Sequence, residues 1–241
     1  MNANPNENNP LINAQSGSML LRLLLCTDVA FIILHISYFQ TPLLESSLYS
    51  LSRDNGFSEF FQYIKFLWII ILLVDVSLKT KTLGYMAWVL LFVYFLADDS
   101  LQLHESFGRV IAGNLNVATP LNLRLQDIGE LIASAIAGAV LFPLLILAYW
   151  RGSQNFRKIS RDLLVFLILL IFVGIGIDMA HEGIGAEGML DRLVFRVLEE
   201  GGEMTVTSLI LWYIFLLSSW NGNVGWYVHE RLRALVSKGS V

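Results

Sequence analysis

The chain has 241 residues, 55% of them hydrophobic and 15% charged, with a formal net charge of −4. Soluble domains are typically about 25% charged. This composition, with a mean hydropathy of +0.61, therefore excludes an ordinary soluble domain and predicts a polytopic membrane protein. The single cysteine, Cys26, excludes an intrachain disulfide, and its apolar surroundings indicate a role in helix packing.

The N-terminal segment is polar and contains no lysine or arginine before Arg22. It therefore lacks the basic start of a signal peptide. We predict a disordered cytoplasmic tail at 1–18, a six-helix transmembrane domain at 19–226 and a basic cytoplasmic tail at 227–241.

Six segments have the roughly 20 mostly apolar residues that a helix needs to cross a bilayer. They are 19–40, 57–78, 84–105, 128–150, 162–182 and 204–220. The predicted fold class is therefore all-α, a polytopic membrane protein with six transmembrane helices. The short connections 79–82 and 151–161 predict two antiparallel hairpins.

The charged residues divide unevenly between the two sides of this topology. Ten lysines and arginines fall on the side of the termini and five on the other side, which predicts cytoplasmic termini in the cell membrane. Fifteen of the twenty acids fall on the outward side, between Glu45 and Glu203. An acidic surface favours cations as partners, beside membrane lipids, and argues against nucleic acid.

Acids and histidines cluster at the outward ends of the last four segments. The third segment ends in Asp98, Asp99, His104 and Glu105, and the fifth in Asp178, His181 and Glu182; the fourth starts at Asp127 and Glu130, and the sixth at Glu200 and Glu203. A charged group in hydrocarbon costs at least ~2.5–3.5 kcal/mol and marks a candidate functional site.

The polar residues at the outward ends of the third and fourth segments resemble those of the fifth and sixth. The similarity predicts an internal repeat of 84–150 and 162–220, with helices three to six in a four-helix bundle around a pseudo-two-fold axis. Residues three or four apart share one helix face. Asp178 and His181 therefore share a face, as do Asp127 and Glu130, and Glu200 and Glu203.

Helix capping is the alternative explanation for part of this cluster. Acids at a helix N-terminus accept hydrogen bonds from free N–H groups and meet the positive end of the helix dipole. That account covers Asp127, Glu130 and the acids at 199–203. It does not cover Asp98, Asp99 or Asp178, which stand at C-terminal ends, where the dipole repels anions.

So many carboxylates cannot all be ionised and unpaired, because like charges at short range repel strongly. Arg124, Arg192 and Arg196 could neutralise part of the cluster, and shared protons another part. We expect one or two divalent metal ions as the cofactor, because two imidazoles and many carboxylates suit iron, manganese or zinc. The expected ligands are Asp98, Asp99, His104, Glu105, Asp127, Glu130, Asp178, His181, Glu182, Glu200 and Glu203.

Four further polar residues lie within the spans. We expect Asp28 and Lys65 to form a buried ion pair, with a proton relay as the alternative, and His35 could add a third imidazole. Asp75, near the inner end, could extend a path across the membrane.

Three functions fit this pattern. The first is a metal-dependent membrane hydrolase or oxidoreductase, with Glu105 or Glu182 as catalytic general base. The second is a divalent-cation or proton transporter, and the third is a metal-binding or assembly protein without turnover. Repeats of one orientation, with acids crowded on one side, favour a one-sided site over a conduit.

Overall fold

The computed structural model describes residues 10–42, 44–115, 124–184, 188–220 and 222, without the side chains of 10–14, 182–184, 189, 190 and 192. Within these ranges the chain forms helices and no strand. They are α1 Pro10–Gln40, η1 Ser47–Tyr49, α2 Phe57–Thr80, α3 Tyr85–Leu101, α4 Leu103–Ala112, α5 Leu125–Arg151, α6 Gln154–Ile171, the π-helix η2 Phe172–Gly176, α7 Ile177–Ile184 and α8 Met189–Ser219. The predicted all-α class is confirmed.

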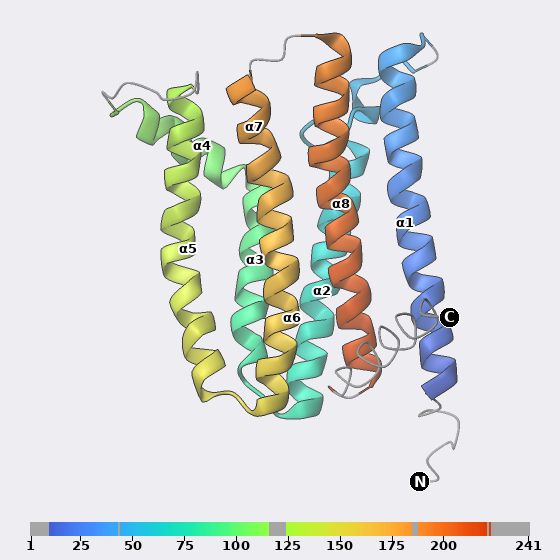
Figure 1. Cartoon of the computed structure of the whole chain (residues 1–241), viewed down its shortest axis with the longest axis vertical. Helices are drawn as coiled ribbons and strands as arrows, with labels where there is room; N and C mark the ends of the chain where they lie inside the picture. The colour runs from blue at the N-terminus through green and yellow to red at the C-terminus, as the bar shows by residue number, and fades with distance from the viewer. Residues whose placement is uncertain (1–9, 43, 116–123, 185–187, 221, 223–241) are drawn as a thin grey trace, which may run out of the picture.

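Five continuous helical stretches are long and apolar enough to cross a membrane, and α3 with α4 forms a sixth span if this bent pair is counted as one. The prediction of a multi-pass helical membrane protein is confirmed. In Figure 1 the long helices run side by side along the vertical axis, with α1 at one edge and α5 at the other.

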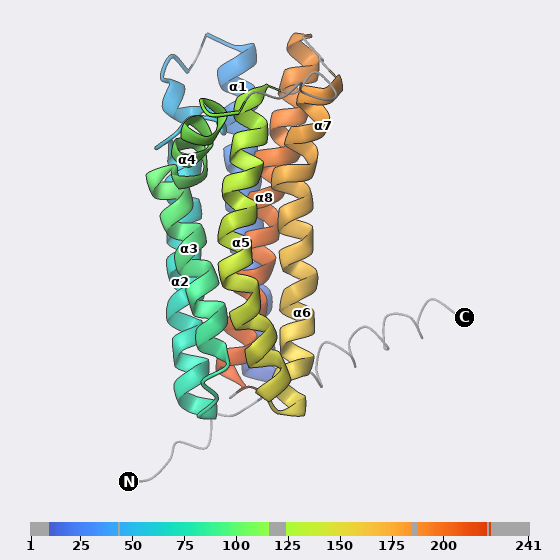
Figure 2. The ribbon, with the colours of Figure 1, turned by 90° about the vertical axis from the view of Figure 1, so that its left-hand side faces the viewer.

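The eighth helix, α8, is the central element. It packs against α1, α2 and α6, while α2 also packs against α3. Its residues Ile210, Leu211 and Ile214 are almost completely buried, as expected for a helix surrounded by others. By contrast, α5 contacts mainly α4 and α3 and is separated from α8 by other helices in Figure 1 and, seen from the side, in Figure 2.

The predicted third span, 84–105, is not one straight helix. It breaks at Gln102, whose φ of 51° is left-handed, and α4 leaves α3 at an angle of 70°. The carboxylate of Asp98 explains the break, because its Oδ1 accepts a hydrogen bond from the backbone N–H of His104 at 2.8 Å. An acid at the end of α3 therefore caps the start of α4.

The sixth span starts earlier than the predicted 204. Helix α8 begins at Met189, because the apolar residues Leu193, Val194 and Val197 continue the helical pattern toward the N-terminus. Glu200 and Glu203 therefore lie inside the helix, three turns or more from its start. The capping explanation is wrong for these two acids.

The first helix also starts earlier than predicted. It begins at Pro10, a residue favoured in the first helical turn, so the helix covers 10–18 of the predicted disordered tail. The tail 227–241 lies outside the described residues. The pseudo-two-fold relation between 84–150 and 162–220 remains a prediction.

Candidate functional site: an acidic pocket at one end of the bundle

Four helices and one loop enclose a cavity of about 120 Å³ near the end of the bundle where α1 and α3 end and α2 begins. We call it the acidic pocket. It is lined by Leu51, Asp54, Ser58, Glu59, Gln62, Asp99, Gln102, His104, Glu105, Glu200, Glu203 and Met204. Six of these residues are acids and none is a lysine or arginine, so the wall of the pocket carries an excess of negative charge.

The loop before α2 and the first turns of α2 form one wall. The Glu59 carboxylate accepts a hydrogen bond from the backbone N–H of Asn55, and Leu51 is held by His35. His35 is completely buried, and its Nδ1 accepts a hydrogen bond from the Leu51 N–H at 3.0 Å. The imidazole of His35 therefore fixes the loop that closes the pocket, rather than lining the pocket itself.

The junction of α3 and α4 forms the second wall. Asp99 precedes the left-handed Gln102, and His104 and Glu105 open α4. Asp98 points to His104 and not into the cavity, with its Oδ2 at 3.0 Å from His104 Nδ1. This pairing fixes the orientation of the imidazole and leaves Nε2 without a hydrogen-bond partner in the described structure.

Helix α8 forms the third wall with Glu200 and Glu203, one turn apart. Glu203 reaches a niche beside Gly174 of the π-helix η2, where any Cβ would collide with Glu203 Oε1. Short π-helices inside α-helices are frequent at functional sites. The unusual turn and the missing side chain together make room for a carboxylate inside the bundle.

Three of the pocket acids, Asp99, Glu200 and Glu203, make no ion pair with any residue that the structure describes. Glu105 pairs with Arg109, with Glu105 Oε2 and Arg109 Nη1 3.4 Å apart. The pocket thus holds three carboxyl groups that have no basic partner in the described structure.

Gln62 lies in the pocket wall on the side of the bundle interior. It is only 6% exposed, its Nε2 donates to Thr207 Oγ1 at 2.8 Å, and its Oε1 has no partner in the described part of the chain. A buried amide oxygen without a donor costs free energy. It is a ready acceptor or ligand for a guest in the pocket.

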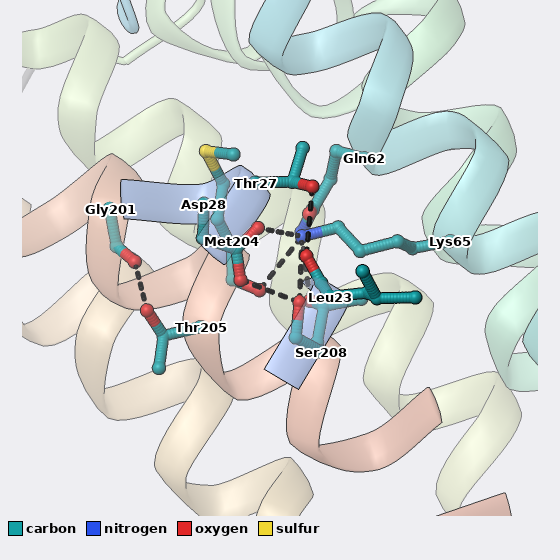
Figure 3. A network of polar contacts seen from close by, with 10 residues as sticks. Leu23, Thr27, Asp28, Gln62, Lys65, Gly201, Met204, Thr205 and Ser208 are labelled. Carbon is teal, nitrogen blue, oxygen red and sulfur yellow. Dashed lines mark hydrogen bonds and ion pairs between the residues drawn. The ribbon is translucent and has the colours of Figure 1, made fainter. Parts of the chain in front are cut away.

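The predicted ion pair between Asp28 and Lys65 lies next to Gln62, on the side of the bundle interior. Figure 3 shows Lys65 reaching between α1 and α8 toward Asp28, Met204 and Ser208. Lys65 Nζ lies 3.1 Å from Asp28 Oδ1 and 2.8 Å from the Met204 carbonyl oxygen, and Ser208 Oγ donates to Asp28 Oδ2 at 2.6 Å. Both charged side chains are completely or almost completely buried, so the expected Asp28–Lys65 pair is confirmed.

The structure brings together five of the eleven predicted ligands, Asp99, His104, Glu105, Glu200 and Glu203. Two others, on α5, have local partners. Asp127 forms a capping box and an ion pair with Arg124, with Asp127 Oδ1 and Arg124 Nη2 2.7 Å apart. Glu130 accepts a hydrogen bond from Gln126 at 2.8 Å. The capping explanation is confirmed for Asp127.

The described side chains of Asp178 and His181 on α7 do not line the pocket. The His181 ring stacks on Phe195 at a centroid distance of 4.7 Å, and Asp178 lies one turn earlier on α7. The side chain of Glu182, predicted as a ligand and as a general base, lies outside the described residues.

Sequence reasoning missed Asp54, Glu59 and Gln62. Glu59, Gln62 and Lys65 recur every three residues on one face of an otherwise apolar span, which is the pattern of a polar stripe facing the bundle interior. That spacing could have identified α2 as a wall of the site.

A family described as "Domain of unknown function (DUF8692)" matches residues 17–219. The chain belongs to this family. The match spans all the helices that form the pocket, so the acidic pocket lies within the family domain. No curated protein and no solved structure matches the chain.

Proposed function

We propose that this protein of the DUF8692 family binds a divalent cation in the acidic pocket, on the membrane face opposite its cytoplasmic termini. The observation that carries the proposal is the convergence of unpaired Asp99, Glu200 and Glu203 on one cavity, beside the unpartnered oxygen of Gln62. Charge of one sign in a low-dielectric site needs a counter-charge, and a metal ion supplies it with fewer groups than arginines would.

The donor set fits a hard cation that keeps part of its water shell. Among the described residues, no three His, Cys, Asp or Glu side chains stand close enough to chelate one ion directly. The cavity of about 120 Å³ exceeds the ~10–15 Å³ that one water needs. Carboxylate, amide and water oxygens suit manganese or magnesium, so manganese is our first choice among the three expected metals.

A metal-dependent hydrolase or oxidoreductase is the activity that we prefer. A bound divalent ion would supply Lewis acidity and an activated water. Glu105 would act as the neighbouring base, whereas His104, which Asp98 holds through Nδ1, would offer its Nε2 to the metal. The same division of roles, with a carboxylate orienting a histidine, recurs in catalytic sites.

Cation transport is the second candidate, favoured by the polar groups that continue below the pocket. Met204 connects the pocket to Lys65 and Asp28, because it lines the cavity and its carbonyl oxygen accepts a hydrogen bond from Lys65. Beyond them, on the same helix faces, Ile69 and Leu73 of α2 are completely buried apolar residues. This apolar layer separates the network from Asp75 and supports a one-sided site.

Titration of purified protein with Mn²⁺ tests the proposal, with binding followed by the loss of the free Mn²⁺ resonance signal. We expect one or two bound ions in the wild type and at least about tenfold weaker binding after Glu200→Gln or Glu203→Gln, since even outer partners of metal ligands contribute that much. Asp127→Asn, on α5, is the matched control and should bind normally.

Equal binding by all three variants would overturn the pocket assignment, and no binding by the wild type would overturn the metal proposal. Mn²⁺ uptake into proteoliposomes separates the two candidate functions. Uptake that is lost in Asp28→Asn would favour a carrier over an enzyme.

A further inference from the structure

Helix α4 has two chemically different faces. His104 and Glu105 line the acidic pocket, whereas Phe107 and Val110 of the same ten-residue helix are 61% and 65% exposed. Leu101, at the bend before α4, is 65% exposed as well. The exposed apolar residues therefore stand within one or two turns of the pocket residues.

The placement of α4 explains what covers its apolar face. It leaves the spanning helix α3 at 70°, so it runs closer to the membrane plane than to the membrane normal. It crosses α5 where Gly108 meets Gly129 and neither position has room for a side chain. Gly129 lies about 6 Å along α5 from Leu125, so α4 crosses α5 near the start of that helix.

The apolar face of α4 continues the lipid-facing surface of its neighbours. On α5, Leu131, Ile136 and Val140 are exposed, and this helix is a candidate span with few buried residues. We therefore expect the exposed apolar residues of α4 to face acyl chains, with its pocket residues at the level of the lipid headgroups.

We propose that the ligand of the acidic pocket is a phospholipid, whose phosphate is bridged to the pocket carboxylates by the bound divalent cation. This inference rests on the proposed metal site. The charges set the order of events, because an acidic pocket without a cation repels a phosphate. The cation therefore binds first, and Phe107 and Val110 then contact the acyl chains of the lipid.

The first test measures where α4 lies. Nitroxide labels are placed at Phe107→Cys and Val110→Cys in a Cys26→Ser background, in phosphatidylcholine proteoliposomes. Arg109→Cys is the matched control, because position 109 is exposed and lies neither three nor four residues from 107 or 110. Labels at 107 and 110 should be relaxed by oxygen, which partitions into lipid, and the label at 109 by an aqueous nickel complex. Relaxation of all three labels by the nickel complex would overturn the interfacial placement and the proposal with it.

The second test measures the ligand by native mass spectrometry of detergent-purified protein with added phosphatidylglycerol. Retained lipid should increase when Mn²⁺ is added and should not be displaced by inorganic phosphate. Phe107→Ser should weaken lipid retention roughly tenfold, the value of one large apolar contact, without changing Mn²⁺ binding.

The outcomes separate the two proposals. Absence of Mn²⁺ binding by the wild type would overturn the proposed metal site. Normal Mn²⁺ binding, with the same amount of lipid retained with and without Mn²⁺, would overturn only the lipid inference. Displacement of the lipid by inorganic phosphate would show that a free phosphate compound is the ligand. If the protein retains phosphatidylcholine equally well with and without Mn²⁺, lipid binding is non-specific. That result would also overturn the lipid inference.

Discussion

Two polar regions lie next to each other inside this membrane protein, and they differ in charge balance. In the Asp28–Lys65 network one carboxylate meets one ammonium, and a hydroxyl and a carbonyl oxygen complete the set. In the acidic pocket, six acids line a cavity without a lysine or arginine. A balanced, closed network holds helices together, whereas an unbalanced, open one is suited to bind a guest.

The contrast also separates two reasons for placing a charge in a membrane span. Lys65 joins α1, α2 and α8 through contacts that all come from the protein, so its role is complete without a ligand. Glu203 has a niche beside Gly174 but no ion-pair partner in the described structure. Only the second arrangement leaves a carboxyl group for a proton or a cation to neutralise.

The largest expected effect is on stability, from Lys65→Met. Removing one partner of a buried ion pair leaves an uncompensated charge and costs about 3–5 kcal/mol, so we expect a large loss of thermal stability in detergent. Lys79→Met is the control, because the Lys79–Asp75 pair is about two-fifths exposed and such pairs contribute only about 0–1 kcal/mol. Equal losses in the two variants would remove the distinction between the closed network and an ordinary surface pair.

A pair of histidine variants sharpens the boundary of the pocket. His104→Ala should lose Mn²⁺ affinity, because His104 lines the cavity. His181→Ala should keep it, because His181 stacks on Phe195 and is not part of the lining. Isothermal titration with Mn²⁺ measures both. Loss of binding in both variants would extend the site to α7, as the sequence predicted.

Replacing Asp98, which contacts His104 but does not line the pocket, should have an intermediate effect on Mn²⁺ affinity. Asp98→Asn keeps the size of the side chain but weakens its hold on His104 Nδ1, and residues in this role typically contribute about 10–100-fold to metal affinity. The variant should also lose about 1 kcal/mol from the weakened cap of α4. Unchanged Mn²⁺ affinity would show that the orientation of His104 is irrelevant to the site.

The smallest effect concerns pH. Protons compete with a metal for carboxylates, so Mn²⁺ affinity should fall as the pH is lowered, while the thermal stability of Glu200→Gln protein should depend less on added Mn²⁺ at every pH. Mn²⁺ titrations at a series of pH values measure the affinity, and thermal melts with and without Mn²⁺ measure the stability. An affinity that rises on acidification would contradict a carboxylate site.

The sequence by itself determined the all-α membrane class, five continuous spans and the buried Asp28–Lys65 pair, but not the bend that divides the predicted third span. The reason is that hydrocarbon length and the cost of buried charge are properties of local sequence. The tertiary structure alone decided which acids meet, because helix starts and bends are set by packing and capping. An early start places Glu200 and Glu203 inside α8, and the cap from Asp98 turns His104 and Glu105 into the pocket.

Glu59 and Asp127 illustrate the same limit. Both are acids in the first turn of a span, and their local sequences indicate capping for each. Asp127 caps α5 and pairs with Arg124, whereas Glu59 binds the Asn55 N–H before its helix and also lines the pocket, because α2 packs against α8. Contacts between helices far apart in sequence decide between these two roles, and they depend on the shape of the whole bundle.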